Sequence, residues 1–187
     1  MAKATIPRRS DGPNPQAAVI WLTGLSGSGK STLAARVAEE LRRRGGDVEI
    51  LDGDAVRDVF PTGFSRQERN EHIRRMGFVA GLLNRHGIWV ICSFISPYRE
   101  SREFARRQAT RFLEIYLATP LAECERRDPK GLYARARRGE IRQFTGVDDP
   151  YEPPENPELV LDTSQMTPDE AAARIVALAL EEGDKTL

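Results

Sequence analysis

The sequence predicts an α/β fold of three layers, in which helices cover both sides of a central, mainly parallel five-stranded sheet. Short apolar runs alternate along the chain with segments whose apolar residues recur at helical spacing, and this alternation is typical of parallel strands joined by helices. One apolar run leads directly into a glycine-rich loop and then a helix. The 187 residues, 40% of them hydrophobic, are enough to bury one continuous core.

Continuous apolar runs predict strands buried on both faces, and segments with an apolar stripe predict the helices between them. Ser65 with Glu68, and Thr167 with Glu170, match capping boxes and predict where two helices begin. The predicted strands are 18–22, 48–51, 88–94, 112–117 and 159–161. The predicted helices are 32–41, a long helix from 65 towards 87, 97–109, a short helix opened by Pro120, and 167–180.

Residues 24–31 match the phosphate-binding P-loop pattern G-x-x-x-x-G-K-[ST]. Its glycines let backbone N–H groups converge on phosphate oxygens, Lys30 places a positive charge near the β and γ phosphates, and Ser31 offers a hydroxyl to Mg²⁺. A strand before it and a helix after it favour a triphosphate site in a P-loop NTPase fold over a turn without a ligand. The expected ATP contacts are Gly24, Leu25, Ser26, Gly27, Ser28, Gly29, Lys30, Ser31 and Thr32, with Ser31 as the metal ligand and Mg²⁺ as the cofactor.

Polar residues also follow the second and third predicted strands. Asp52 and Asp54 end the second strand, and Ser96 follows the third. Because ligands of open parallel sheets bind at the carboxyl ends of the strands, we expect these side chains near the P-loop. A carboxylate there can order Mg²⁺-bound water or accept a proton from an attacking hydroxyl, which leaves both aspartates as candidate bases. Arg57, one helical turn beyond Asp54, suits an anionic acceptor.

The pattern changes after residue 128, where glycines, prolines and charges crowd together and the only helical segment indicated is 132–140. Long irregular stretches in compact domains are more often functional loops than accidents. We therefore expect a mobile lid over about 128–154, with a solvated excursion as the alternative.

Composition argues against several classes of function. Acidic and basic residues balance at 28 each, so no overall field favours nucleic acid or an anionic membrane, and no run approaches the roughly twenty apolar residues that cross a bilayer. Cys92 and Cys124 have no metal-binding spacing and fit free thiols in a reducing cytoplasm. We expect a flexible tail over 1–17 and a single P-loop domain over 18–187.

Further strings of residues resemble the adenylylsulfate kinase (APS kinase) family over about residues 18–180. The most discriminating are F-I-S-P-Y-R at 94–99, D-P-K-G-L-Y at 128–133 and F-T-G-V-D-D-P-Y-E-P-P at 144–154. Members of this family use ATP to phosphorylate the 3′-hydroxyl of adenosine 5′-phosphosulfate (APS), which gives PAPS. The resemblance therefore implies an ATP-dependent kinase of sulfate activation.

The resemblance also implies roles for individual residues. Lys30, Asp54 and Ser96 would be catalytic, and Asp54 would contact the acceptor's 3′-hydroxyl. Phe64 and Phe144 would stack on its adenine. The expected acceptor contacts are Asp52, Asp54, Arg57, Phe64, Arg69, His72, Ile95, Ser96, Lys130 and Phe144.

Two of these residues have alternative interpretations. Ser96 corresponds to a residue that family descriptions call a phosphoserine intermediate, or its hydroxyl caps the helix expected from Pro97. His72 stands where family members commonly have asparagine, and it either donates a hydrogen bond to the ligand or is a surface histidine. The stretch between Arg57 and Gly63 is about two residues shorter than is usual in the family.

Other functions stay open on the sequence alone. They are a related small-molecule kinase acting on a sugar or a nucleoside, a nucleotide-binding module without turnover, and the kinase half of a larger sulfate-activating complex. The expected partners are ATP and APS, without nucleic acid or membrane. A homodimer is suggested by the resemblance, and a sulfurylase partner is left open.

Overall fold

The computed structural model describes residues 14 and 16–181 and contains one five-stranded sheet in the order β2-β3-β1-β4-β5. Every strand pair in it is parallel, so the predicted sheet is confirmed. All five strands lie within about one residue of the predicted runs. They are β1 (Val19–Thr23), β2 (Val48–Asp52), β3 (Trp89–Ser93), β4 (Phe112–Leu117) and β5 (Leu159–Leu161).

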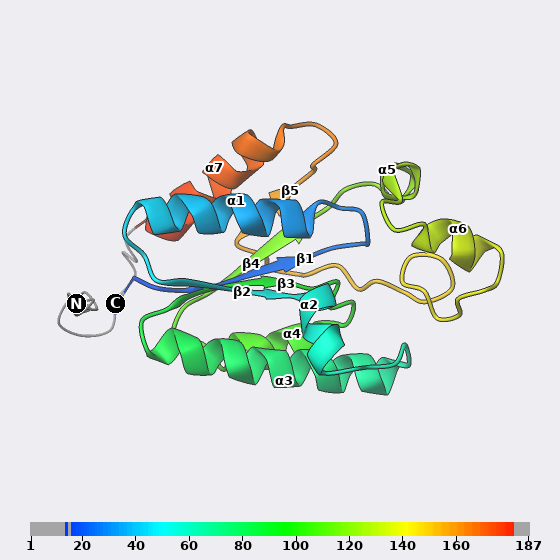
Figure 1. Cartoon of the computed structure of the whole chain (residues 1–187), viewed down its shortest axis with the longest axis horizontal. Helices are drawn as coiled ribbons and strands as arrows, with labels where there is room; N and C mark the ends of the chain where they lie inside the picture. Colours follow the sequence, from blue (N-terminus) through cyan, green and yellow to red (C-terminus); the bar gives the residue numbers. More distant parts are fainter. Residues whose placement is uncertain (1–13, 15, 182–187) are drawn as a thin grey trace, which may run out of the picture.

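Helices cover both faces of this sheet, which gives the three predicted layers (Figure 1). One layer contains α1 (Lys30–Arg43) and α7 (Pro168–Leu180), and the other contains α3 (Arg66–Arg85) and α4 (Arg99–Arg106). The shorter helices lie towards the carboxyl ends of the strands. These are α2 (Gly53–Val59), α5 (Leu121–Arg127) and α6 (Leu132–Arg137).

The central strand β1 is buried along its whole length and feeds both sides of the core. Ile20 and Leu22 pack with α1 and α7, whereas Val19 and Trp21 pack with α3 and α4. This alternation explains why the strand reads as an unbroken apolar run. The two cysteines are buried free thiols, as expected.

Both predicted capping boxes are present, with Ser65 and Glu68 at α3 and Thr167 and Glu170 at α7. The expected start of α4 at residue 97 is wrong, because the helix begins at Arg99 and ends at Arg106. Ser96 has a left-handed φ of 41°, and the helix is preceded by an extended residue that makes no side-chain cap. Ser96 therefore does not cap α4.

The described chain begins just before β1. Ala17 is buried in the core, and its N–H donates to the carbonyl of Asn14 at 3.2 Å. The expected flexible tail falls mainly on residues 1–13 and 15, which lie outside the described residues. No helix in the described ranges is both long and apolar enough to span a bilayer.

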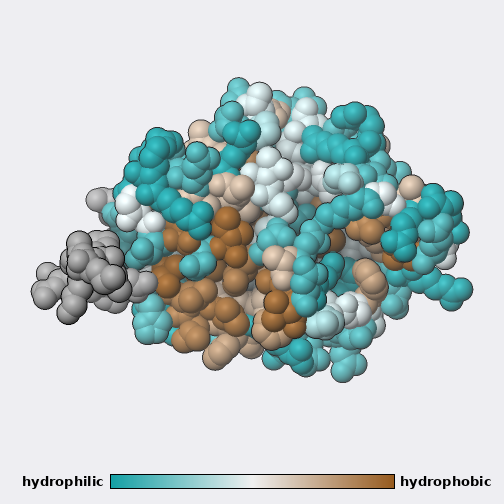
Figure 2. Space-filling view, in the orientation of Figure 1, coloured by the Kyte–Doolittle hydropathy of each residue, from teal (hydrophilic) through white to brown (hydrophobic). Residues whose placement is uncertain are grey.

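Hydrophobic residues gather on one part of the surface, on the side of the molecule that carries β2 and α3 (Figure 2). Phe78 and Leu82 lie one turn apart on α3 and are 53% and 42% exposed, and Phe60 after α2 is 51% exposed. Contiguous exposed apolar surface is typical of contact sites between proteins. The homodimer expected from the resemblance stays a prediction.

Candidate active site

A cavity of about 520 Å³ opens at the carboxyl edge of the sheet, where the P-loop, α2, the turn after β3 and the lid segment (128–154) meet. The structure therefore brings together the regions that the sequence predicted to converge. The predicted site residues that line it are Ser26, Gly27, Gly29, Lys30, Ser31, Thr32, Asp52, Asp54, Arg57, Arg69, His72, Ile95, Ser96 and Lys130. The predicted residues outside its lining are Gly24, Leu25, Ser28, Phe64 and Phe144.

The P-loop joins β1 to α1 through glycines that no other residue could replace without strain. Gly24 and Gly27 have φ values of 149° and 76°. A Cβ atom at Gly24 would lie 2.7 Å from the carbonyl oxygen of Leu117, and one at Gly27 would lie 2.9 Å from that of Cys124. Because glycine has no Cβ atom, the loop can lie this close to β4 and α5 while its backbone turns around the cavity.

Lys30 is the cation of this loop and is only 9% exposed. Its ammonium donates to the carbonyl oxygens of Gly24 at 3.0 Å and Leu25 at 2.7 Å, and to Ser28 Oγ at 3.3 Å. Burial lowers the pKa of Lys30 to about 8, since nearby acidic groups only partly compensate for lost hydration. The charge is held where phosphates would stabilise it.

Ser31 and Asp52 form the oxygen-rich side of the cavity. Ser31 Oγ donates to Asp52 Oδ2 at 2.6 Å and lies 3.3 Å from Ser93 Oγ, while Asp52 Oδ1 accepts the N–H of Asp54 at 3.0 Å. Partial burial raises the pKa of Asp52, but the hydrogen bonds it accepts from Ser31, Asp54 and Ser93 outweigh this, and the net pKa is below its usual value.

Such oxygen ligands fit Mg²⁺, which binds a few protein oxygens and keeps waters and phosphates as its other ligands. No group of three or more His, Cys, Asp or Glu side chains in the described part of the chain could hold a metal by itself. The residues present therefore suit an ion that arrives with the nucleotide. Ser31 Oγ would hold such an ion directly, and Asp52, which accepts the Ser31 hydrogen bond, would hold it through its waters.

Asp54 has different surroundings from Asp52. It lies in the first turn of α2, and its carboxylate forms an ion pair with the ammonium of Lys130 from the lid segment. Both side chains are half exposed, and Arg57 lies one turn further along α2 and lines the same cavity. Asp54 is therefore the aspartate that faces the open part of the site.

The hydroxyl of Ser96 is enclosed. Ser96 is 2% exposed, its Oγ accepts the indole N–H of Trp21 at 3.1 Å, and it donates to Thr23 Oγ1 at 3.0 Å. Thr23 in turn donates to the carbonyl of Ile95 at 2.8 Å. No carboxylate or imidazole of the described residues hydrogen-bonds to Ser96 Oγ, so the base that would activate a nucleophile is missing from its contacts.

His72 is 5% exposed, so its interpretation as a surface histidine is wrong. Its ring meets Phe94 edge-on with centroids 6.0 Å apart, and its Nε2 has no hydrogen-bond partner among the described residues. Burial lowers the pKa of His72, and the positive charges of Arg57 and Arg75 lower it further. A neutral imidazole with an unpaired ring nitrogen therefore lines the cavity, and pairing it with a ligand would remove a desolvation cost.

Neither of the two predicted aromatic residues lines the cavity. Phe64 has the guanidinium of Arg69 5.3 Å from its ring centroid, and Phe144 is buried edge-on against Tyr133. Arg69 also donates to Thr145 Oγ1 at 3.0 Å and to the Gln143 carbonyl at 2.7 Å. Arg69 thus ties α3 to the lid segment, and the stacking of both rings on a purine stays a prediction.

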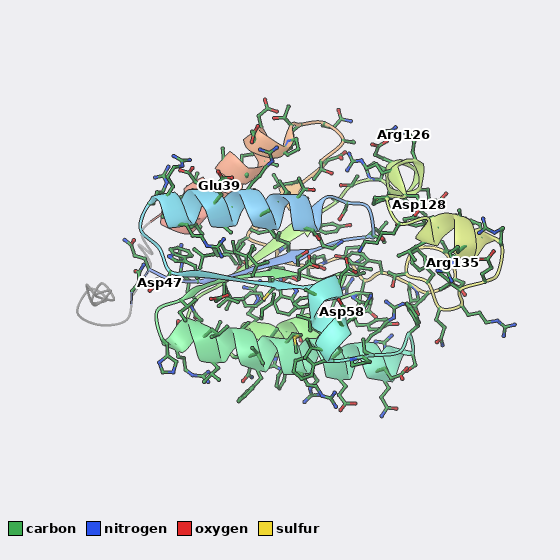
Figure 3. All side chains as sticks on the ribbon, viewed as in Figure 1. Glu39, Asp47, Asp58, Arg126, Asp128 and Arg135 are labelled. Atoms are coloured by element: carbon green, nitrogen blue, oxygen red, sulfur yellow. The ribbon has the colours of Figure 1, made fainter. Side chains whose placement is uncertain are left out.

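The lid segment has a small core of its own and rests on the P-loop. Tyr133 on α6 donates its hydroxyl to the carbonyl of Ser26 at 3.0 Å, and Phe144 packs near Leu25 and Cys124. Figure 3 shows Asp128 at the start of this segment and Arg135 on α6, beyond the end of the sheet. The lid segment is thus a packed part of the structure, and it contacts both the P-loop and Asp54.

One end of the cavity was missed by the sequence analysis. Arg127 donates to Thr163 Oγ1 at 2.8 Å and to the Thr163 carbonyl at 2.9 Å, and Thr163 donates to the carbonyl of Ser28 at 2.9 Å. Since β5 and β2 are the opposite edges of the sheet, this end lies across the P-loop from Asp54. The position of Thr163 just after β5 could have indicated it. The missed lining residues here are Arg127, Thr163, Met166, Thr167, Pro168 and Ala171.

Comparisons with known proteins agree on one family. The family model described as Adenylylsulphate kinase matches residues 16–162. An adenylyl-sulfate kinase from Gloeothece citriformis is 54% identical over 159 residues, which covers 84% of this chain and 90% of the relative. One from Halothermothrix orenii is 48% identical over 172 residues, or 91% of this chain and 93% of the relative.

A solved structure is similar in both sequence and fold. The Mycobacterium tuberculosis APS kinase in complex with AMPPNP and APS has a TM-score of 0.84 and 44% identity, covering 89% of this chain and 98% of the other. These matches confirm the resemblance that the motifs indicated. The chain belongs to the adenylylsulphate kinase family.

Proposed function

We propose that this chain transfers the γ-phosphate of ATP to the 3′-hydroxyl of APS and releases PAPS and ADP. The observation that carries the proposal is one continuous cavity with Lys30 in its P-loop and Asp54 on its open side. Family membership supports the choice of acceptor, since the similar Mycobacterium tuberculosis enzyme was solved with APS and an ATP analogue. Phosphoryl transfer mainly requires such positioning and charge stabilisation.

In this proposal the chain's residues divide between the two nucleotides. The P-loop amides and Lys30 hold the β and γ phosphates of ATP, and the end of the cavity at Arg127 and Thr163 takes its base. Ser31 would hold Mg²⁺, which would neutralise charge on the phosphate oxygens. Asp54 accepts the proton of the 3′-hydroxyl of APS while the hydroxyl oxygen bonds to the γ-phosphorus of ATP. The bond between that phosphorus and the ADP oxygen breaks at the same time. The acceptor contacts are Arg57, Arg69, His72, Ile95 and Lys130, with Phe64 and Phe144 on its adenine.

The test is a substrate profile of the purified chain. With Mg²⁺ and ATP, we expect PAPS formation from APS and about 10²-fold lower kcat/KM with gluconate or a nucleoside. Gluconate has no base for the adenine contacts, and a nucleoside has no anionic group for the cationic contacts. A preference for gluconate or a nucleoside would identify a different small-molecule kinase. Calorimetric binding of ATP and APS without turnover would identify a regulatory module.

We propose a structural role for Ser96 in place of a covalent one. Ser96→Ala is expected to keep kcat within about tenfold of wild type, since an obligatory nucleophile would lose activity by orders of magnitude. Unfolding should be easier by roughly 1–3 kcal/mol, because Trp21 and Thr23 lose a buried partner. Steady-state kinetics and thermal unfolding measure both effects.

The matched control is Ser101→Ala, which removes another buried hydroxyl, one bonded to the Tyr98 carbonyl at 3.0 Å and outside the cavity lining. Both variants should lose stability while keeping turnover. A Ser96→Ala enzyme that folds like wild type but has no activity would contradict the structural role, as would a phosphoserine at this position that forms and decays as fast as turnover.

The assembly of the chain is also a proposal. An APS kinase from Thiobacillus denitrificans is described as hexameric; it matches with a TM-score of 0.69 and 35% identity, over 92% of this chain but only 30% of that chain. This supports self-association of kinase domains in relatives. We propose a homodimer in the cytoplasm, and size-exclusion chromatography with light scattering tests the dimer; a sulfurylase partner stays a prediction of the resemblance.

A further inference from the structure

We propose that Arg102 on α4 is a positioning residue for the acceptor nucleotide. Its guanidinium joins the turn 95–97, which lines the acceptor side of the cavity, to the segment 149–153, by which the lid returns to the sheet. The inference rests on the proposed function, because it names which of the two nucleotides depends on this contact.

The side chain of Arg102 is 2% exposed and donates in three directions. Its Nε bonds to Glu114 Oε1 on β4 at 2.7 Å, its Nη1 to the Ser96 carbonyl at 2.6 Å, and its Nη2 to the Glu152 carbonyl at 2.7 Å. A planar guanidinium can serve three fixed acceptors at once, which a lysine ammonium on a flexible chain does less well. Arg102 therefore fixes three separate segments relative to one another.

The turn needs such a contact because its backbone is strained. Ser96 is a non-glycine residue with φ of 41°, a conformation that costs about 1–2 kcal/mol. Hydrogen bonds from a charged donor are stronger than neutral ones, so Arg102 can hold the Ser96 carbonyl in this orientation. Ile95, Ser96 and Pro97 all line the cavity, and any relaxation of the turn would move its wall.

The segment 149–153 meets the same turn. The N–H of Glu152 donates to the Pro97 carbonyl at 2.8 Å, the N–H of Arg99 donates to Glu152 Oε2 at 2.9 Å, and the Tyr98 hydroxyl donates to Asp149 at 2.9 Å. The turn and the base of the lid thus form one unit, and Arg102 bonds to both halves of it. Among the described residues, Arg102 hydrogen-bonds to none in the P-loop, so its loss should leave the ATP side of the cavity unchanged.

Stability alone does not account for a charge buried here. Desolvation offsets much of the attraction in a buried ion pair, and an apolar pair of similar volume is often as stable. Glu114 also pairs with Arg106, one turn further along α4, whose other partner is Glu158. Arg106 makes no hydrogen bond to Ser96 or Glu152 among the described contacts, and it is therefore a matched control.

The experiment compares Arg102→Lys with Arg106→Lys. For Arg102→Lys we expect kcat/KM for APS to fall by about 10- to 100-fold, since displacement of a substrate-positioning wall by about 1 Å can cost that much. The KM for ATP should stay within about twofold. Arg106→Lys should leave both values near wild type. Equal losses for ATP and APS, or equal losses in the two variants, would overturn the proposal.

A second pair of variants separates positioning from folding. The double variant R102M/E114M removes both buried charges and is expected to stay folded, yet it lacks the bonds to Ser96 and Glu152 and should show the same APS defect. Glu114→Gln keeps those bonds and should lower the unfolding temperature without changing KM for APS. A double variant with wild-type kinetics for APS would refute the inference. Wild-type enzyme that phosphorylates another acceptor would instead refute the proposed function.

Discussion

Replacement of Lys30 by methionine is expected to lower kcat/KM for ATP by about 10³-fold while the chain stays folded. Removing one preorganised charge from a developing transition state typically has an effect of this size. Lys30 is the P-loop cation, and its ammonium already lies in a ring of carbonyl and hydroxyl oxygens from Gly24, Leu25 and Ser28. Methionine keeps the length of the side chain without the charge, so the loss reports electrostatics more than packing.

As rising pH removes the proton of Lys30, the free energy of unfolding should increase, whereas activity should fall. Burial lowers the pKa of Lys30 from 10.5 to about 8, so between these values the unfolded chain binds more protons than the folded one. The stability contribution of this group therefore rises as pH increases from about 8 to 10.5. Lys30→Met should remove that rise. Denaturant unfolding of the ligand-free protein at several pH values measures it.

The same pKa predicts the pH dependence of ATP use. The kcat/KM for ATP reports the free enzyme, so in wild type it should decline above about pH 8 as the Lys30 amine loses its proton. Lys30→Arg keeps its charge throughout this range and, although slower, should show no decline near pH 8. A wild-type profile that is flat from pH 7 to about 10 would contradict the assignment of Lys30.

The sequence was sufficient to predict the helices and strands for which local residue patterns agree with the burial in the structure. β1 is apolar throughout because it is the middle strand and has a helix layer on each side. The P-loop lies between this strand and α1, so its position followed from the motif. The starts of α3 and α7 were predicted correctly because Ser65 and Thr167 pair locally with acidic residues three positions later.

The sequence did not predict the surroundings of side chains whose partners lie far away along the chain. The hydroxyl of Ser96 is bonded to Trp21 and Thr23, more than 70 positions earlier in the chain, and no local pattern indicates that pairing. The burial of Arg102 could not be predicted from the sequence. Arginine is the common cation of this chain, and most of the described arginines lie at the surface. The buried ring of His72 packs edge-on against Phe94, which follows β3 and also lies outside the helix of His72.

Asp54→Asn is expected to lower kcat by about 10²- to 10⁴-fold with little change in KM for ATP, because a general base contributes about that much to the rate. Asp54 is preferred over Asp52, whose two oxygens accept hydrogen bonds from Ser31 and the Asp54 N–H, whereas the carboxylate of Asp54 is half exposed beside the acceptor side of the cavity. PAPS formation under saturating ATP and APS measures the effect.

The control for charge is Asp58→Asn, which removes a carboxylate from the same short helix outside the cavity lining (Figure 3) and should leave turnover unchanged. Lys130→Met separates the base from the lid contact, because it breaks the Lys130–Asp54 ion pair but keeps the carboxylate. This variant should raise KM for APS and retain more kcat than Asp54→Asn. If the two substitutions lower kcat equally, the carboxylate acts through the ion pair with the lid, and proton acceptance by Asp54 is refuted.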